Sequence, residues 1–277
     1  MTLYYKNHLN NTIDLMEWPI MIQDPESLFK YNWKYTSGVS IKRLTAFKKE
    51  VSERDCTLSI FASSKEEFNN ILNTILEVTE IDITNEQPGK LYYNNYYLDC
   101  YIIAGGLDEW EPDFEATDKK IKIASQEGKW IKETTIPFRW QEQQVDQSGK
   151  TYPYNYPYNY GIGTGFNSEV EVDSISDMDF IITIYGYAHN PEISIGENTY
   201  KIEHEVSPSE ILVINSKDKT VYLINRSTGI VKSMFRYRSK DYWIFEKIPS
   251  GDHLVYWNGA YNFDLQLLEE RSEPKWT

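Results

Sequence analysis

The sequence predicts a mainly β protein made of two β-rich modules that are joined by a stiff connector. Aromatic residues make up 15% of the 277 residues, with 22 Tyr and 8 Trp, and such residues favour strands and interfaces because each ring buries a large area. Short strand-like runs separated by turn residues fill the second half of the chain, which is typical of a sandwich. A Pro-containing repeat lies between the two halves.

The connector is a tandem repeat. Tyr152-Pro153-Tyr154-Asn155 is followed at once by Tyr156-Pro157-Tyr158-Asn159. Proline fixes φ and has no N–H, and the residue before it is pushed into an extended conformation. The repeat therefore predicts an extended, semi-rigid segment whose rings are free to pack, with Tyr154, Tyr156 and Tyr158 as the candidate packing residues.

The same region divides the chain into its expected domains. A polar stretch precedes the repeat, and Gly161-Ile-Gly163-Thr-Gly165 follows it. We expect a linker zone at 141–165, an N-terminal β-sandwich at 1–140 and a C-terminal β-sandwich at 166–277.

One helix is expected in the first module. Ser64 and Glu67 have the spacing of a capping box, which satisfies the free N–H groups of a first helical turn. The apolar residues that follow recur at helical spacing: Phe68, Ile71, Leu72, Ile75 and Leu76. This pattern predicts an amphipathic helix at about 64–78 that lies flat on a sheet.

Strands are expected on both sides of this helix. The alternation in 31–35 predicts a half-buried strand, and 39–47 and 56–61 are further candidates. Asn94-Asn95 is typical of a tight turn and predicts a hairpin at 91–103. Its strands contain four tyrosines: Tyr92, Tyr93, Tyr96 and Tyr97. The acidic stretch 108–118 is interpreted as a loop.

The second module reads as a regular series of strands. Ten are expected: 170–172, 180–187, 193–195, 200–202, 211–215, 220–225, 230–236, 243–245, 253–257 and 261–267. The last one alternates cleanly, so Tyr261, Phe263 and Leu265 should share one buried face.

Charge and composition exclude several classes of function. A formal net charge of −14 argues against nucleic-acid binding and against docking on an anionic membrane, because both need a basic surface. The sequence shows no run of about 18 apolar residues and no signal peptide, which predicts synthesis and folding in a cytoplasm. Cys56 and Cys100 are then expected to be reduced core thiols.

No motif predicts catalysis, a cofactor or a metal ion. The four histidines form no ligand pattern, and His204, between two glutamates, is interpreted as a solvated strand residue. The glycines of 161–165 are interpreted as linker rather than as a phosphate loop. Acidic groups at 108–113 and 173–179 are interpreted as solvated loops. A pair of glycosidase carboxylates stays open, because fold rather than spacing sets such pairs.

Exposed aromatic residues are compatible with two functional interpretations. A sandwich that displays Trp and Tyr can bind a sugar by stacking, or it can use the rings in cores and subunit contacts. The second reading is favoured, because 22 Tyr is more than one ligand site uses and interfaces select for Tyr and Trp.

Three features together resemble the distal tail proteins of long non-contractile-tailed phages of Gram-positive hosts. They are the 152–160 repeat after a β-rich module, the turn Ile248-Pro249-Ser250-Gly251 followed by strands around Asn258-Gly259, and the ending Glu270-Arg271-Ser272-Glu273-Pro274-Lys275-Trp276. The resemblance covers most of the chain.

The resemblance implies a structural protein of the virion tail, made in the bacterial host. It implies an N-terminal sandwich with a helix and an extended hairpin that forms a homo-hexameric ring, and a galectin-like C-terminal sandwich. In such a ring the hairpin at 91–103 is the candidate inter-subunit arm, through Tyr92, Tyr93, Tyr96 and Tyr97. The partners would be the tail tube protein, a tail-tip or tail-associated protein and receptor-binding proteins. Two rivals are kept open: a carbohydrate-binding module that aids adhesion to the cell wall, and a wall-degrading enzyme with two facing carboxylates in a cleft.

Overall fold

The computed structural model describes residues 1–37, 44–107, 116–139 and 166–276. They form two compact units: unit 1 consists of Met1–Lys132 and Glu270–Thr277, and unit 2 consists of Glu133–Glu269. The expected module boundaries differ from these units. The chain enters unit 2 within β11 (Trp130–Phe138) and returns to unit 1 at the end of β22 (Asn262–Arg271). The expected linker packing of Tyr154, Tyr156 and Tyr158 lies outside the described residues.

The strands of unit 1 pair antiparallel around one long strand, β9 (Tyr96–Leu107). Its first half pairs with β8 and β11, and its second half pairs with β10, so β9 belongs to both halves of a curled sheet. One side continues as β9-β10-β7-β4-β3 and the other as β9-β8-β1-β2. The remaining bounds are β1 Leu3–Lys6, β2 Thr12–Asp14, β3 Met16–Glu17, β4 Ile20–Ile22, η1 Pro25–Phe29, β7 Ser52–Ile60, β8 Gly89–Tyr93 and β10 Thr117–Ser125.

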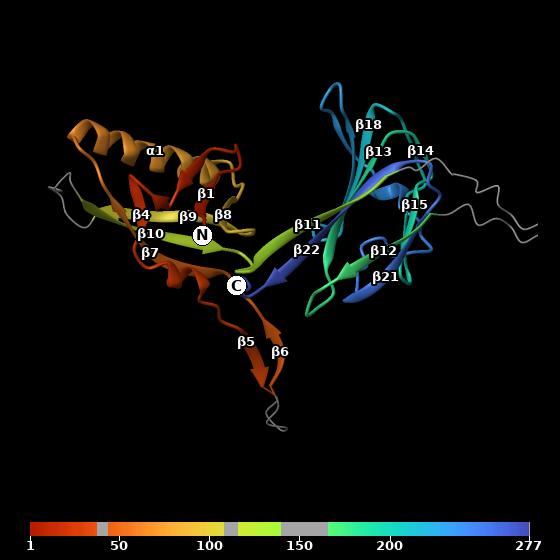
Figure 1. The fold of residues 1–277 in the computed structure, drawn as a ribbon, viewed down its shortest axis with the longest axis horizontal. Coiled ribbons are helices and arrows are strands. Elements are labelled where there is room, and N and C mark those ends of the chain that lie inside the picture. The colour runs from red at the N-terminus through yellow and green to blue at the C-terminus, as the bar shows by residue number, and fades with distance from the viewer. Residues whose placement is uncertain (38–43, 108–115, 140–165, 277) are drawn as a thin grey trace, which may run out of the picture. The chain divides into compact units, whose positions relative to one another are not determined.

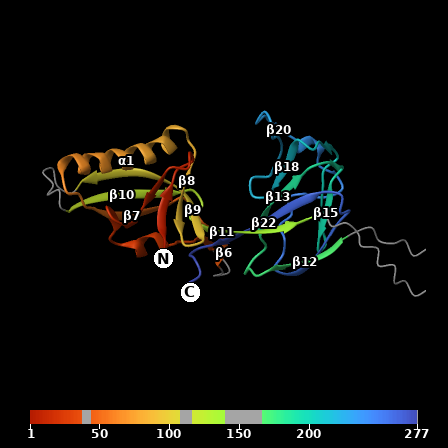
Figure 2. The ribbon, with the colours of Figure 1, turned by 45° about the horizontal axis from the view of Figure 1, so that its top comes forward.

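Helix α1 (Lys65–Thr84) starts where the sequence predicts, and it ends six residues beyond the predicted end at 78. The Ser64 side chain accepts the Glu67 N–H at 3.2 Å, and the Glu67 carboxylate accepts the Ser63 N–H at 2.8 Å. In Figures 1 and 2 the helix lies across one face of the unit 1 sheet. Leu76, expected on the buried stripe, is 57% exposed. Val78 is buried instead, because the helix turns this later side chain toward the core.

A two-stranded hairpin stands apart from the sheet of unit 1. It consists of β5 (Lys34–Ser37) and β6 (Leu44–Lys48), which pair with each other antiparallel. The prediction of a half-buried strand at 31–35 was wrong, because these side chains are exposed and β5 starts only at Lys34. Of the predicted strand at 39–47, residues 39–43 lie outside the described residues, and β6 covers its second half. Alternation of aromatic and polar residues predicts burial only where a second layer covers one face.

Unit 2 is a β-sandwich of antiparallel strands whose two sheets share one core. One sheet has the order β20-β19-β18-β13-β22 and the other β12-β21-β15-β16, with β14 and β17 as a separate pair. The bounds are β12 Phe166–Val172, β13 Asp179–Tyr185, β14 Ala188–His189, β15 Glu192–Ile195, β16 Asn198–Lys201, β17 Glu205–Val206, β18 Glu210–Asn215, β19 Thr220–Asn225, β20 Val231–Ser233, η2 Phe235–Tyr237 and β21 Gly251–Trp257.

The predicted strands of unit 2 agree with the structure in part. Tyr261, Phe263 and Leu265 are buried on one face, which confirms the alternation. The predicted strand at 243–245 is wrong, because these residues form a turn. The predicted strand at 230–236 is shorter, since β20 ends at Ser233 and η2 follows.

Candidate assembly surfaces

The hairpin at 91–103 forms as predicted, but it lies inside the sheet. β8 pairs with β1 on one side and with β9 on the other. Tyr93, Tyr96 and Tyr97 are buried in this chain, and Tyr92 stacks on Tyr4 with ring centroids 4.7 Å apart. Three of the four tyrosines are therefore covered by unit 1 itself, whereas Tyr92 is half-buried, and a role of this hairpin between subunits stays a prediction.

A buried carboxylate attaches α1 to the first strand. Asp82, which is 0% exposed, accepts hydrogen bonds from the Tyr5 hydroxyl at 2.5 Å and from the His8 N–H at 3.0 Å. The His8 ring lies against the same carboxylate. Burial, and then the bond to Asp82, raise the pKa of Tyr5 above its ordinary value. The cluster is internal to unit 1, and we interpret it as structural.

The β5–β6 hairpin, called the arm from here on, carries exposed aromatic side chains. Tyr35 and Phe47 are 57% and 56% exposed, and their ring centroids are 6.3 Å apart. In Figure 1 the arm projects from unit 1 in the direction away from α1. Rings that no layer covers are typical of a contact surface rather than of a core.

The arm is also cationic. Lys34 lies directly opposite Lys48 in the strand register, and like charges opposite each other destabilise a strand pair. At the base of the arm, the Lys49 ammonium lies 5.3 Å from the Trp33 ring centroid. Burial, followed by the positive charges of Lys129 and Arg54, lowers the pKa of Lys49 to about 8. The arm and its base therefore carry several lysines, of which Lys34 pairs with the exposed carboxylate of Glu50 at 2.5 Å.

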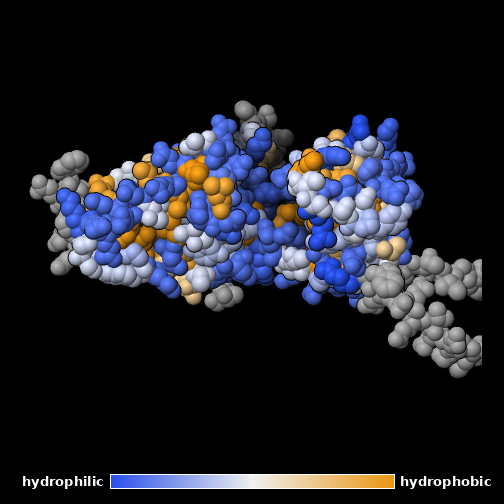
Figure 3. Space-filling model, turned by 90° about the horizontal axis from the view of Figure 1, so that it is seen from above, coloured by the Kyte–Doolittle hydropathy of each residue, from blue (hydrophilic) through white to orange (hydrophobic). Residues whose placement is uncertain are grey.

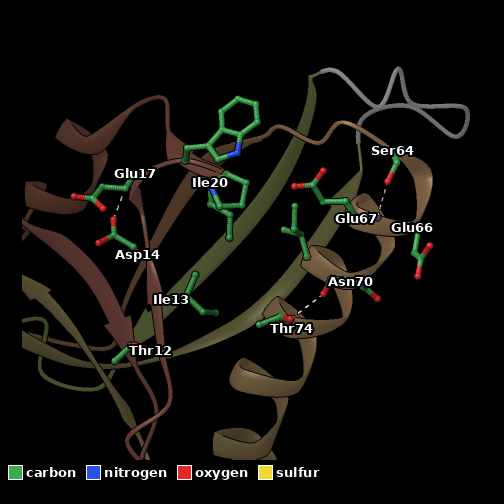
Figure 4. A pocket seen from close by; sticks show the side chains of 13 residues that line it. Thr12, Ile13, Asp14, Glu17, Ile20, Ser64, Glu66, Glu67, Asn70 and Thr74 are labelled. Carbon is green, nitrogen blue, oxygen red and sulfur yellow. Dashed lines mark hydrogen bonds between the residues drawn. The ribbon is translucent and has the colours of Figure 1, made fainter.

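A groove between the N-terminal strands and α1 is lined by acidic and apolar residues, in contrast to the lysines of the arm. Its volume is about 520 Å³, and its lining comes from β2 to β4 and from the first three turns of α1. Trp18, which is 63% exposed, forms one wall and stacks on Phe61 with ring centroids 5.2 Å apart. Ile13 and Ile20 lie between the two walls (Figure 4). The groove therefore offers an aromatic wall and an apolar floor.

Carboxylates stand on both walls of this groove, which we call the Trp18 groove. Asp14 and Glu17 come from the strand side, and Glu67 points from α1 toward them (Figure 4). Backbone N–H groups hold two of these groups in place: Asp14 accepts from Met16 at 2.8 Å and from Glu17 at 3.1 Å, and Glu67 accepts from Ser63. None of the lining residues is Lys, Arg or His.

A third surface lies along α1 and is mainly apolar. Hydrophobic residues gather on the face of unit 1 that carries the helix (Figure 3). Leu76 and Ile83 from α1 and Ile103 from β9 are exposed there, and they line a cavity of about 210 Å³. The surface has little charge of its own to select a partner.

Unit 2 carries an exposed aromatic cluster around η2. Phe245 is buried, and Phe235 stacks on it with ring centroids 5.9 Å apart, while Trp243 meets it edge-on at 5.4 Å. Phe235 and Trp243 are themselves exposed. Arg238 lies over the Phe235 ring at 4.1 Å. The cluster combines stacking surface with positive charge.

Two of the candidate groups predicted from the sequence, Asp179 and His204, make contacts within unit 2. Asp179 is buried and bonds Ser216 and Lys247, and the His204 ring packs against Tyr237. Cys56 and Cys100 are free and buried, and burial raises the pKa of both thiols. In the described part of the chain, no group of His, Cys, Asp and Glu is placed to hold a metal ion. Nor does any helix among these residues have the length and apolar character needed to cross a bilayer. The glycines of 161–165 lie outside the described residues.

Solved structures of phage baseplate proteins are similar to this chain. No protein-family model matches the chain, and no curated protein matches it. A chain of the phage P2 baseplate in its activated conformation with Ca has a TM-score of 0.62 at 12% identity, covering 99% of this chain and 100% of that one. The same baseplate with Sr gives equal values. The SPP1 Dit protein, described as a paradigm of the hub adsorption apparatus in phages that infect Gram-positive bacteria, has a TM-score of 0.57 at 8% identity over 98% of both chains.

This chain has the fold of these phage baseplate proteins. The likeness covers nearly the whole length, so it includes both units and the returning C-terminal segment. Because one fold can serve many functions, the role of this chain is argued below from its surfaces.

The arm and the Trp18 groove were not predicted, although the sequence contains a signal for each of them. Residues 30–49 contain six Lys or Arg and no Asp or Glu, within a chain of net charge −14. The dipeptide Trp18-Pro19 is typical of a turn and does not by itself indicate a groove. The groove is hard to predict because its walls come from segments about 50 positions apart in the sequence, one with Trp18 and the other with Glu67.

Proposed function

We propose that this chain is a structural protein of a phage tail, acting as a hub at the distal end of the tail tube. In this proposal unit 1 forms a ring, six subunits being the expected number. The ring connects the tube to the tail-tip protein and to receptor-binding proteins. We assign the chain no catalytic role.

The observation that carries the proposal is the full-length likeness to baseplate hub proteins. The likeness extends over 98–99% of this chain. The surface chemistry supports it, because unit 1 presents an exposed cationic arm, an acidic groove and an apolar helix face. Several different contact surfaces on one small unit are what a protein with several neighbours needs.

Unit 2 is proposed to be the galectin-like module of the sequence resemblance, on the outside of the ring. Its sandwich of two antiparallel sheets supports this assignment. A second function, binding of cell-wall carbohydrate, is favoured by one observation only, the exposed Phe235 and Trp243 around Phe245. Sugar rings stack on such aromatic faces.

Location in the particle tests the proposed function. Gold-labelled antibody against this chain should bind purified virions at the end of the tail that is distal to the capsid. The matched control is labelling with pre-immune serum. Label on the capsid or along the whole tail tube, or absence of the chain from particles by mass spectrometry, would reject the hub role.

A further inference from the structure

The charge of unit 2 is unevenly distributed. Residues 226–240 contain five Lys or Arg and no Asp or Glu, in a chain whose formal net charge is −14. Four of these cations fall within nine positions: Lys232, Arg236, Arg238 and Lys240. Within the described part of the chain, none of these four side chains forms an ion pair with a carboxylate. The positive charge around η2 is therefore available to an anionic ligand.

The two arginines of this segment are held by neutral groups. The Arg238 Cζ lies 4.1 Å from the Phe235 ring centroid, and its Nη1 donates to the Phe235 carbonyl oxygen at 3.0 Å. The Arg236 Cζ lies 4.7 Å from the Tyr237 ring centroid, and its Nη2 donates to the Tyr237 hydroxyl at 2.6 Å. A guanidinium has five N–H donors, so each arginine keeps donors for a second acceptor. An arginine that is fixed on a ring is well suited to pair with a planar carboxylate or with phosphate.

Exposed aromatic faces lie beside these arginines. Phe235 and Trp243 both contact the buried Phe245 ring, the first stacked on it and the second edge-on. Arg238 covers part of Phe235, whereas Trp243 is 53% exposed and is the more open of the two rings. Its neighbour Tyr242 is exposed as well. An apolar ring face with a few charged donors at its edge can both hold and orient a polar ligand.

We infer that this part of unit 2, called the η2 surface and formed by Phe235, Arg236, Arg238 and Trp243, binds an acidic saccharide. The apolar C–H side of a sugar ring packs on the indole of Trp243, and the carboxylate or phosphate of the saccharide accepts hydrogen bonds from Arg236 and Arg238. The inference rests on the second function proposed above, carbohydrate binding, and adds the chemical class of the sugar. The position of the chain in a tail does not depend on it.

Charge and ring surface together select this class of ligand. A neutral saccharide would pack on the indole but would leave two guanidinium groups without an anion. A peptide of Asp and Glu would pair with the arginines, but it has no flat apolar face for the indole. A saccharide with an acid group provides both. Exposed charge pairs contribute little one at a time, so the ring contact supplies affinity and the arginines decide which sugar binds.

A panel of four ligands tests the inference on the full chain by isothermal titration calorimetry. Tetragalacturonate supplies carboxylates, phosphopentamannose supplies a phosphate, mannopentaose is neutral, and hexaglutamate has charge without sugar rings. We expect at least one of the acidic saccharides to bind roughly tenfold tighter than both mannopentaose and hexaglutamate. This preference should disappear at high salt, because exposed charges are then screened. The tighter of the two acidic saccharides identifies the acid group.

Two variants separate the charge from the ring contact. Arg236→Gln with Arg238→Gln keeps both side chains long and polar, and it should remove the preference for the acidic saccharide while the binding of mannopentaose stays unchanged. Trp243→Ala removes the indole, and it should weaken the acidic and the neutral saccharide by a similar factor, roughly fivefold.

Matched controls make the same changes in unit 1. Lys30→Gln with Lys65→Gln removes two exposed positive charges, and Trp18→Ala removes an exposed indole. These variants should bind the saccharides like the original chain. Circular dichroism checks that each variant is folded.

Three results would overturn the inference. The first is that neither acidic saccharide binds tighter than mannopentaose, and the second is that hexaglutamate binds as tightly as the acidic saccharides, as expected for an acidic protein partner. The third is that the double arginine variant keeps the preference of the original chain. None of these results bears on the hub role, which the labelling of virions tests by itself.

Discussion

Replacing Asp82 by alanine is expected to lower the free energy of unfolding of unit 1 by about 3 kcal/mol, because the change breaks a buried, charge-assisted network. The Tyr5 hydroxyl and the His8 N–H both donate to this carboxylate. Without it, two donors stay buried with no acceptor, and α1 loses its polar attachment to β1. Asp82→Asn should also destabilise, since one amide oxygen replaces two carboxylate oxygens.

Hydrogen exchange in α1 and β1 measures this effect. Protection factors in these two elements should fall for Asp82→Ala, and those in unit 2 should not change. Glu80→Ala is the matched control, because Glu80 is an exposed acidic residue two positions away. Equal protection in Asp82→Ala and Glu80→Ala would contradict the structural role of the cluster.

Replacing Phe263 by alanine is expected to destabilise unit 2 by about 4 kcal/mol, as removal of a large ring from a packed core does. Phe263 is 0% exposed and stacks on Phe138 with ring centroids 4.5 Å apart. Trp257 meets the same ring edge-on at 5.4 Å. The loss therefore includes the buried area and two specific aromatic contacts.

The same hydrogen-exchange measurement separates the two units. Protection in β13 and β22 should fall for Phe263→Ala, while α1 and β9 keep theirs, because each unit has its own hydrophobic core. Leu254→Ala, on the partly exposed strand β21, is the control and should have a small effect. A parallel loss of protection in α1 would show that the units unfold together, against the division into two cores.

Local sequence patterns correctly predicted features of elements that pack against another layer of the fold. The capping residues located the start of α1, and the alternation in β22 located its buried face. The end of α1 was not predictable from the apolar stripe. The helix continues because Val78 packs in the core and Asp82 bonds to β1, and both partners are distant in sequence.

The surfaces were harder to predict than the core. Tyr93 and Tyr96 looked like residues for a neighbouring subunit, but unit 1 buries them. Tyr35 was predicted to be half-buried, but it is 57% exposed. A strand pattern does not tell which of its faces will meet another layer, because that depends on the whole topology. The C-terminal segment gives a similar case: Trp276 packs against Phe29 of unit 1 with ring centroids 4.9 Å apart.

The most direct measurement of the central claim, that this chain assembles through unit 1 into a ring, is its mass by light scattering over a concentration series. The account predicts a concentration-dependent rise to six times the 32.6 kDa of one chain. A mass of one chain at every concentration and at both low and high salt would contradict it.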